Sequence, residues 1–474
     1  MSTLSELVSR SQKQFRYIQN NIDVTQDFFN SYFLVLTLLN TYKQKIIFLF
    51  LDGSYESAAI LLACLSRNIQ THAYSQELSM EEIRSELEIF RPHLLVCPRT
   101  KSHNLADAGL FNKPIFSMSF FNFHQPQNFA MIDSKKGVNE KKLVTRTSGS
   151  TGYPKYLNIT ESLITQRYKK FVEIYDLKNT RQLLVSSSFH QTITMRALFS
   201  SIYLKGTFRS IVPFNWIEWT NDFNNSESFA LLVPPQLRKI LNQDNLVKDS
   251  KGKILLSSST SNAKEKLLIL EKLCDEFYEC YGTAEVAIIT SKRHRVLEID
   301  NIESLGSPIP GAEILVREGD GKITVKSSEA VSEIWMSDGK KLKRIKIGDW
   351  YDTGDYGRIL NGELFFLGRG IEIINVGGSK VFASEIERVL LNHPDIDQCL
   401  AFPIPNEKLE QVVGLAVVTK NKFLHKSQIQ QFASINLEKF KIPQIVLFLQ
   451  ELPITAGGKP DRLSLVKMVE QPSV

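Results

Sequence analysis

The sequence contains few cysteines, and none of them stands in a pair with a recognisable spacing. There are five in 474 residues, an odd number, and no two of them form a C-x-x-C motif. Small secreted domains that depend on disulfides have many, evenly paired cysteines. We therefore expect reduced and mostly buried thiols, and a cytoplasmic location.

Metal-binding spacings, long apolar runs and basic arms are also missing. The eight histidines include no H-E-x-x-H pattern. The most apolar stretches, at 33–39 and 46–51, are far shorter than the ~20 residues that cross a bilayer, and the N-terminus lacks the layout of a signal peptide. The net charge of +6 is spread along the chain. We expect no membrane span and no nucleic-acid partner, although the positive excess could also help an acidic partner protein to dock.

Apolar runs alternate with helical patterns in the first part of the chain. The continuous run at 46–51 is typical of a strand buried on both faces. It is followed by a predicted helix at 55–67, a strand at 71–74, a helix at 80–90 and a strand at 93–97. Such alternation predicts an α/β fold with a parallel sheet layered by helices.

The remaining segments predict at least two domains, as the length also suggests. We expect residues 1–42 to be helical and residues 99–141 to be irregular, apart from a short strand at 114–120. Short strands after about residue 300 predict a small β subdomain, and the chain beyond Gly368-Arg369-Gly370 predicts a compact α+β domain. The expected architecture is a large N-terminal domain of layered α/β sheets at 1–368, whose β subdomain covers about 300–368, and a small mobile α+β C-terminal domain at 369–474, with a hinge near 368–371.

Nine residues between two strand-like segments carry the most informative pattern. They are Thr147-Ser148-Gly149-Ser150-Thr151-Gly152-Tyr153-Pro154-Lys155. Glycine lets the backbone approach a ligand closely, successive N–H groups form an anion-binding concavity, and hydroxyls add donors. The nucleotide-binding spacing G-x-x-x-x-G-K-[ST] is absent. The pattern predicts a polyphosphate cradle, and a flexible hairpin tip is the alternative.

This stretch resembles the signature loop of the adenylate-forming superfamily, which includes acyl- and aryl-CoA synthetases, stand-alone adenylation domains and luciferases. Further elements of that family follow in order. They are Tyr281-Gly282-Thr283-Ala284-Glu285, Trp350-Tyr351-Asp352-Thr353-Gly354-Asp355, Gly368-Arg369, Gly377-Gly378 with Glu385-Ile386-Glu387, and Pro453-Ile454-Thr455-Ala456-Gly457-Gly458-Lys459-Pro460-Asp461-Arg462. The five ordered matches cover roughly the last two-thirds of the chain.

The resemblance implies an ATP-dependent ligase that converts a carboxylic acid to acyl-AMP with release of pyrophosphate. The acyl group then passes to a thiol, either of coenzyme A or of the phosphopantetheine arm of an acyl carrier protein. The implied ligands of ATP are Thr147, Ser148, Gly149, Ser150, Thr151, Gly152, Lys155, Ser258, Tyr281, Gly282, Thr283, Asp355 and Arg369. Asp355 is expected at the ribose, and Glu285 with Thr151 is expected at Mg²⁺.

Two residues are expected at the reacting acid. By the resemblance, Lys459 reaches the α-phosphate and the substrate carboxylate, where a positioned ammonium stabilises developing charge. His190 resembles the residue that gates the acyl pocket; a structural histidine is the alternative. Relatives that activate α-amino acids have an aspartate at this position, so its absence favours an aryl or alkyl acid.

Three positions depart from the family pattern. Ala284 replaces a usual threonine, Ile371 stands where Asp or Lys is usual, and Asn375 replaces a common lysine. We interpret them as specialisation. The competing hypothesis, supported by Ala284 and Ile371, is a catalytically weakened member that acts as a binding or assembly component of a biosynthetic system.

Overall fold

The structure is a computed structural model, and it describes residues 4–41, 46–67, 69–107, 111, 114–118, 142–147, 154–224, 227–248, 251–257, 261–296, 301–337, 342–453 and 460–470. The chain divides into two compact units. Unit 1 consists of Met1–Ile302, Gly306–Glu313 and Lys326–Tyr351, and unit 2 of Glu303–Leu305, Ile314–Val325 and Asp352–Val474. Within the described part of the chain, every helix is too short or too polar to cross a membrane. The predicted hinge near 368–371 falls inside unit 2 and stays a prediction.

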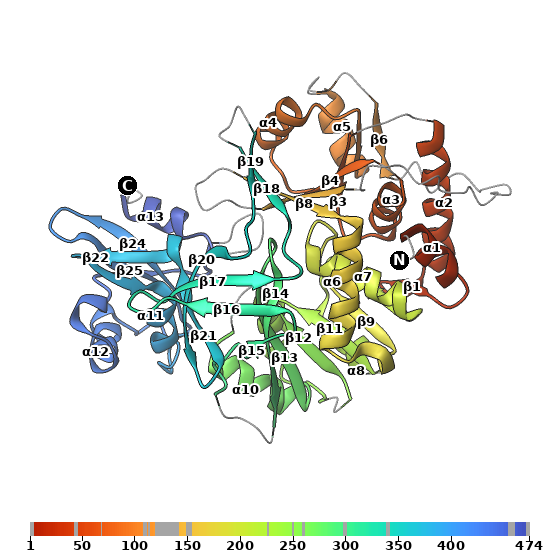
Figure 1. Cartoon of the computed structure of the whole chain (residues 1–474). Helices are drawn as coiled ribbons and strands as arrows, with labels where there is room; N and C mark the ends of the chain where they lie inside the picture. Colours follow the sequence, from red (N-terminus) through yellow and green to blue (C-terminus); the bar gives the residue numbers. More distant parts are fainter. Residues whose placement is uncertain are drawn as a thin grey trace. The chain divides into compact units, whose positions relative to one another are not determined.

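One sheet of unit 1 has eight strands. Their order is β19 (Leu342–Lys346), β18 (Glu333–Ser337), β8 (Lys155–Thr160), β7 (Lys142–Thr147), β4 (Gln70–Ser75), β3 (Ile46–Leu51), β5 (Leu94–Cys97) and β6 (Ile115–Ser117). The strands from β7 to β6 run parallel. The central strand β3 is buried from Ile47 to Leu51, as expected of a strand covered on both faces. Helices α3 (Tyr55–Leu65) and α4 (Met80–Phe90) connect these strands (Figure 1).

The other sheet of unit 1 has nine strands. Their order is β15 (Ser307–Pro308), β14 (Ala287–Arg295), β13 (Glu276–Thr283), β12 (Lys253–Leu256), β11 (Ser228–Leu232), β9 (Gln182–Val185), β10 (Thr207–Ser210), β1 (Arg16–Gln19) and β2 (Ile22–Asp23). Its helices are α6 (Glu161–Ile174), α7 (Thr192–Leu204), α8 (Trp216–Asn224), α9 (Pro234–Leu241) and α10 (Ala263–Lys272). A buried core of α8, α9 and α10 side chains packs on this sheet around the stacked rings of Trp219 and Phe223.

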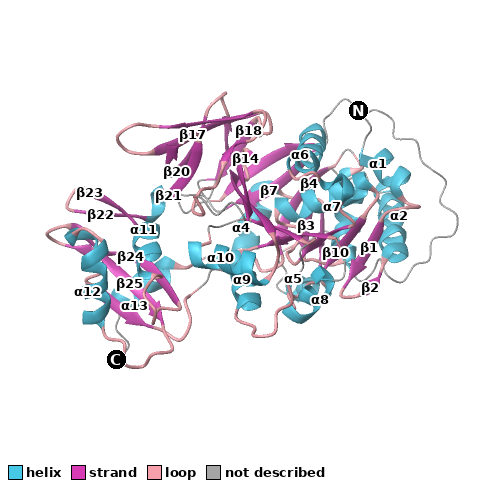
Figure 2. Cartoon of the chain, turned by 90° about the horizontal axis from the view of Figure 1, so that it is seen from below, coloured by secondary structure: helices cyan, strands magenta, loops and turns pink. Residues whose placement is uncertain are grey.

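Unit 2 is built mostly from two small sheets. The first has the order β16 (Ala312–Val316), β17 (Lys322–Ser327), β20 (Tyr351–Leu360) and β21 (Glu363–Arg369). The second has β23 (Ser379–Phe382), β22 (Ile373–Val376), β25 (Glu410–Val418) and β24 (Gln398–Asn406), with β26 (Ile445–Phe448) on β25. Helices α11 (Ala383–Leu390) and α12 (Lys426–Asn436) pack on one face of the second sheet, and α13 (Arg462–Glu470) packs on the other (Figure 2).

The sequence-based expectation fails in two segments. Residues 1–42 are not uniformly helical, because β1 and β2 separate α1 (Leu4–Ser11) from α2 (Thr25–Thr41). The four-residue β1 is held by its distant parallel partner β10, against which the ring of Tyr17 packs 5.0 Å from that of Phe208. The region after residue 99 was expected to be irregular, yet α5 covers Arg99–Asp107. Most residues of this helix are polar, so the sequence shows no apolar periodicity, although Leu105 is fully buried and holds the helix against the protein. The rest of 99–141 lies largely outside the described residues.

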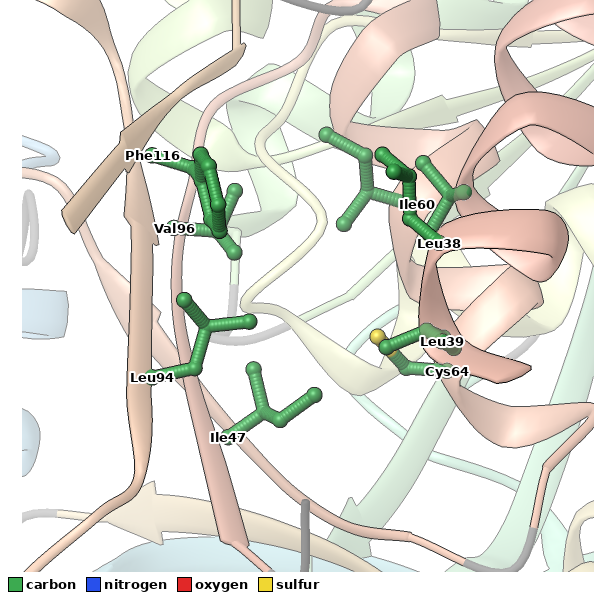
Figure 3. Close-up of a pocket in the computed structure, with 9 residues that line it drawn as sticks. Leu38, Leu39, Ile47, Ile60, Cys64, Leu94, Val96 and Phe116 are labelled. Carbon is green, nitrogen blue, oxygen red and sulfur yellow. The ribbon is translucent and has the colours of Figure 1, made fainter. Parts of the chain in front are cut away.

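A small cavity of about 20 Å³ lies between helices α2 and α3 and the strands β3, β5 and β6. Figure 3 shows Leu38, Leu39, Ile60 and Cys64 on the helix side, facing strand side chains that include Leu94 and Phe116. All the lining side chains are apolar except for the thiol of Cys64, whose pKa burial raises to about 12. An apolar gap of this size, with a thiol as its one weakly polar group, offers nothing to orient a substrate, so we assign it to imperfect packing.

Candidate active site

The two ends of the predicted phosphate cradle lie side by side. Strand β7 ends at Thr147 and β8 begins at Lys155, and these two residues are cross-strand partners in an antiparallel pair. The Thr147 hydroxyl donates to the carbonyl of Lys155 at 3.5 Å. The cradle residues Ser148, Gly149, Ser150, Thr151 and Gly152 lie outside the described residues, so their roles stay predictions.

A buried ionic network supports this hairpin. The carboxylate of Glu86, on α4, accepts hydrogen bonds from the hydroxyls of Tyr74 at 2.9 Å and Tyr156 at 2.8 Å. It also pairs with Arg146 at 3.0 Å, one residue before Thr147. Burial raises the pKa of Glu86, whereas the hydrogen bonds and the arginine lower it. Because β7 and β8 are tied to α4 beneath their tips, the loop ends are held in a defined place.

The first residues of the YGTAE element, Tyr281 to Thr283, form the end of strand β13. The register of β13 against β14 shifts between Tyr281 and Gly282. A Cβ atom on Gly282 would lie 2.0 Å from the carbonyl oxygen of Ala287, so only glycine fits this position. Next to it, the buried hydroxyl oxygen of Thr283 has no hydrogen-bond partner in the described part of the chain. An orphaned buried hydroxyl beside a bulge suits a residue that completes its hydrogen bonding on a polar ligand such as ATP.

Arg167, on helix α6, fixes the main chain at Glu285. Its guanidinium donates to the carbonyls of Ala284 at 3.3 Å and Glu285 at 3.2 Å, and twice to that of Glu329, at 3.1 and 2.8 Å. The carbonyl of Glu285 also accepts the N–H of Val331 at 2.8 Å. Burial, assisted by the charge of Arg196, lowers the pKa of Arg167 to about 9. The backbone that carries the predicted Mg²⁺ ligand is therefore held from two sides.

The donor set fits magnesium better than a metal caged by protein side chains. No group of three or more His, Cys, Asp or Glu residues in the described ranges could hold a metal ion. Mg²⁺ is commonly bound through one or two carboxylates together with substrate phosphates and water. A single positioned carboxylate at Glu285, which is 8% exposed, suits that kind of site.

In unit 2, Asp355 and Arg369, two of the predicted ATP ligands, lie close together. They are cross-strand partners on β20 and β21, and the Arg369 Nε lies 3.2 Å from Asp355 Oδ1. Asp355 is 2% exposed, and its N–H donates to the hydroxyl of Thr353, which donates in turn to the carbonyl of Ile323. The carboxylate is thus held by strand pairing and not by a flexible turn.

His190 lies in the turn between β9 and α7, next to the end of β3. The N–H of Phe189 donates to the carbonyl of Asp52 at 3.0 Å, and the hydroxyl of Ser188 donates to that of Leu51 at 2.9 Å. His190 Nδ1 lies 2.9 Å from the same Ser188 hydroxyl. Burial lowers the pKa of His190 to about 4, so the imidazole is neutral at pH 7.

Lys459 and Ser258 lie outside the described residues, but the anchors around Lys459 are visible. The N–H of Asp461 donates to the carbonyl of Pro453 at 2.9 Å. Arg462 pairs with Glu372 at 2.9 Å and with Glu387 at 2.8 Å. The chain is therefore fastened to unit 2 on both sides of the predicted catalytic segment.

Sequence reasoning missed the buried residues behind the YGTAE element: Arg167, Arg196 and Glu329, which are 5%, 7% and 1% exposed. A signal for Arg167 was present. It stands among Ile164, Tyr168 and Phe171 on the apolar face of a helix, and a charged residue at a core position needs partners.

Comparison with known proteins matches both parts of the chain to family models. The model "AMP-binding enzyme" matches residues 34–340, and "AMP-binding enzyme C-terminal domain" matches residues 385–459. The malonate–CoA ligase of Arabidopsis thaliana is 24% identical over an alignment 377 positions long, which covers 71% of this chain and 62% of that protein. The 2-succinylbenzoate–CoA ligase of Lactococcus lactis is 27% identical over an alignment 441 positions long, which covers 88% of this chain and 89% of that protein.

A solved structure agrees in fold over almost the whole chain. The o-succinylbenzoate CoA synthetase of Bacillus subtilis, in complex with its acyl-adenylate intermediate, superimposes with a TM-score of 0.83 at 20% identity and covers 97% of both chains. The α/β architecture and the family resemblance predicted from the sequence are both confirmed. This chain belongs to the family of AMP-binding enzymes.

Proposed function

We propose that this chain uses ATP and Mg²⁺ to convert a carboxylic acid into acyl-AMP and pyrophosphate, and then transfers the acyl group to the thiol of coenzyme A. The observation that carries the proposal is the Thr283–Glu285 segment, because it presents a hydroxyl without a partner among the described residues and a carboxylate, from a backbone whose carbonyls accept hydrogen bonds from Arg167. Both curated relatives described above are named as CoA ligases, which supports coenzyme A over a carrier protein as the acceptor.

The described residues have separate tasks in this reaction. Lys155, at the start of β8, contributes positive charge beside the phosphates. Thr283 donates its free hydroxyl to ATP, and Glu285 holds Mg²⁺. Asp355 accepts hydrogen bonds from the ribose hydroxyls while Arg369 keeps its carboxylate oriented. Bound Mg²⁺ neutralises phosphate charge, so that the substrate carboxylate can approach the α-phosphorus.

Lys459 is proposed to stabilise the charge that develops as the carboxylate attacks. The acyl group then lies near His190. Its imidazole is neutral, because burial lowers its pKa to about 4. No acidic group stands at this position to accept an ammonium, which supports an aryl or alkyl acid.

Ala284 does not by itself favour the alternative of a weakened binding component. Its contribution to the turn is the main-chain carbonyl that Arg167 contacts at 3.3 Å, and any residue type supplies a carbonyl. The departure from the family pattern removes a hydroxyl and leaves the clamp intact.

The experiment is an acid-dependent ATP–pyrophosphate exchange screen, followed by product analysis with coenzyme A and with a phosphopantetheinylated carrier protein. We expect exchange with at least one aryl or alkyl acid, and thioester formation with coenzyme A. If no acid supports exchange while ATP binds with ordinary affinity, the catalytic proposal is wrong and the weakened-member alternative gains support. Thioester formation on the carrier protein alone would change the acceptor.

A further inference from the structure

Arg196 is a buried cation to which the described residues offer no hydrogen-bond acceptor. It lies on α7 and is 7% exposed. Among the described residues it makes neither a hydrogen bond nor an ion pair, and it acts through its charge on the carboxyl of Glu329. Its guanidinium carbon lies 5.9 Å from the centre of the Phe171 ring. A guanidinium carries five N–H donors, and burying an unpaired charge is costly. This arginine therefore has unused capacity to bind an anion.

The side chain lines a cavity that is large enough for a small anionic group. The cavity has a volume of about 30 Å³ and lies between α6, α7 and the strands β7 and β8. Thr192, Arg196 and, from α6, Arg167 line it together with apolar side chains. A space of this size holds one or two waters, or one carboxylate group.

The cavity begins close to the predicted acyl pocket. Thr192 is the first residue of α7, two positions after His190. Thr192 and Arg196 are four residues apart and hence share a helix face, one turn from each other. A group bound at Arg196 would thus lie about one turn farther along α7 than Thr192, while another part of the same acid lies at His190.

The charges around the cavity leave a positive excess. Arg167 and Arg196 act electrostatically on one buried carboxyl, that of Glu329, with Lys170 as a further positive neighbour. Burial raises the pKa of Glu329, against the effect of these cations, and its Oε1 has no hydrogen-bond partner in the part of the chain that the structure describes. Glu285 also acts on Arg167, but in the proposed reaction it holds Mg²⁺. Two arginines are therefore offset by one carboxyl group.

We propose that Arg196 binds a second carboxylate of the acid that this chain activates, so that the substrate is a dicarboxylic acid. The proposal rests on the proposed function, because it assigns the far end of the same acid. The planar guanidinium can hold a carboxylate through two parallel N–H···O bonds. A monocarboxylic acid of equal length would leave the guanidinium of Arg196 without a hydrogen-bonded carboxylate.

The test compares acids of matched length by ATP–pyrophosphate exchange: succinate with butyrate, glutarate with pentanoate, and adipate with hexanoate. We expect the best diacid to exceed its partner at least tenfold in kcat/KM. Arg196→Met should lower kcat/KM for that diacid at least 100-fold and leave the monoacids within threefold. Arg196→Lys keeps the charge but not the planar fork, and should restore part of the diacid activity, mainly through KM.

The outcomes separate this inference from the proposed function. Equal use of diacids and monoacids by the wild-type chain overturns the inference and leaves the proposed function standing, whereas no exchange with any acid overturns both. If Arg196→Met does not fold, the test relies on Arg196→Lys. A KM for the diacid equal to that of the wild type would then overturn the assignment. If sulfate stimulates monoacid exchange in the wild type but not in Arg196→Met, the site binds a free anion and the substrate assignment fails.

Discussion

Replacing Arg167 with methionine tests whether a buried clamp positions the metal ligand. Methionine retains the helix propensity and much of the volume of the arginine stem, but it removes every donor to the carbonyls of Ala284, Glu285 and Glu329. Glu285 keeps the N–H of Val331, so two carbonyls lose the hydrogen bonds that the structure gives them. At about 1–3 kcal/mol for each unsatisfied buried group, the gross loss is about 2–6 kcal/mol.

The net loss should lie in the lower half of that range. Arg167 and Arg196 are buried close enough for the charge of one to lower the pKa of the other, and removing one buried charge relieves that repulsion. We expect Arg167→Met to decrease the free energy of unfolding by about 3 kcal/mol, measured by urea titration and circular dichroism. Its matched control is Arg181→Met: the Arg181 side chain is 75% exposed and pairs with Glu227 at 3.4 Å, so the loss should be under about 0.5 kcal/mol.

The functional measurement is pyrophosphate exchange as a function of Mg²⁺ concentration. Once its backbone is loosened, Glu285 should hold the ion less well, and we expect the Mg²⁺ concentration for half-maximal rate to rise about tenfold, in line with the loss seen when groups that orient metal ligands are removed. For Arg167→Lys, the Mg²⁺ concentration for half-maximal rate should lie between those of the wild type and of Arg167→Met, because one ammonium cannot reach three carbonyls. A variant that is destabilised but has the wild-type Mg²⁺ dependence would refute the link between Arg167 and the ligand. One that keeps full stability would refute the account of its hydrogen bonds.

Three further outcomes are expected. Lys459→Ala should lower pyrophosphate exchange ~100-fold or more while ATP binding and melting temperature stay near wild type; exchange within a few-fold of wild type would exclude the assigned role. Gly370→Pro should impair thioester formation from preformed acyl-AMP more than exchange, because proline restricts φ at the predicted hinge, and equal loss in both half-reactions would contradict a hinge there. For Glu276, burial raises the pKa, but hydrogen bonds from Arg293 and Tyr278 and the charges of Lys253 and Arg293 lower it to about 2. Its stabilisation is therefore present above the unfolded value of 4.5 and is lost as pH falls towards 2. After discounting for solvent screening it should amount to about 1 kcal/mol, so Glu276→Gln should lose less stability than wild type between pH 4.5 and 2.5, and parallel pH curves would contradict this.

Elements that depend on nearby residues were predicted well from the sequence. The run at 46–51 forms β3 with those bounds, because burial on both faces leaves a continuous apolar signature. The helix at 80–90 also has its predicted bounds, and Ser79 and Glu82 form a capping box at its start. By contrast, the sequence did not predict strand β1, because no pattern within residues 16–19 indicates that they pair with the distant strand β10.

The same distinction applies to the site. The family motifs indicated Thr283, Glu285 and Asp355 because these residues stand in short, recognisable patterns. Arg167 lies 118 positions from Glu285, whose carbonyl it contacts, and Arg196 stands in no motif. Their importance follows from burial and from which neighbours they have or lack, and those are properties of the folded chain.

The pairing of β1 with β10 has a consequence for the order in which the chain can fold during synthesis. The N-terminal segment is fixed by residues made much later: Leu4 donates to Glu161 at 2.7 Å, and Ser11 donates to the carbonyl of Ile202, 191 positions away, at 2.8 Å. At about 5–20 residues per second, a ribosome needs roughly 10–40 s to make that stretch. Throughout this interval strand β10 has not yet been made, so Tyr17 and the α2 ring of Phe28 that packs on it lack their final neighbour. The nascent chain is therefore most exposed to misassociation before residue 210 emerges.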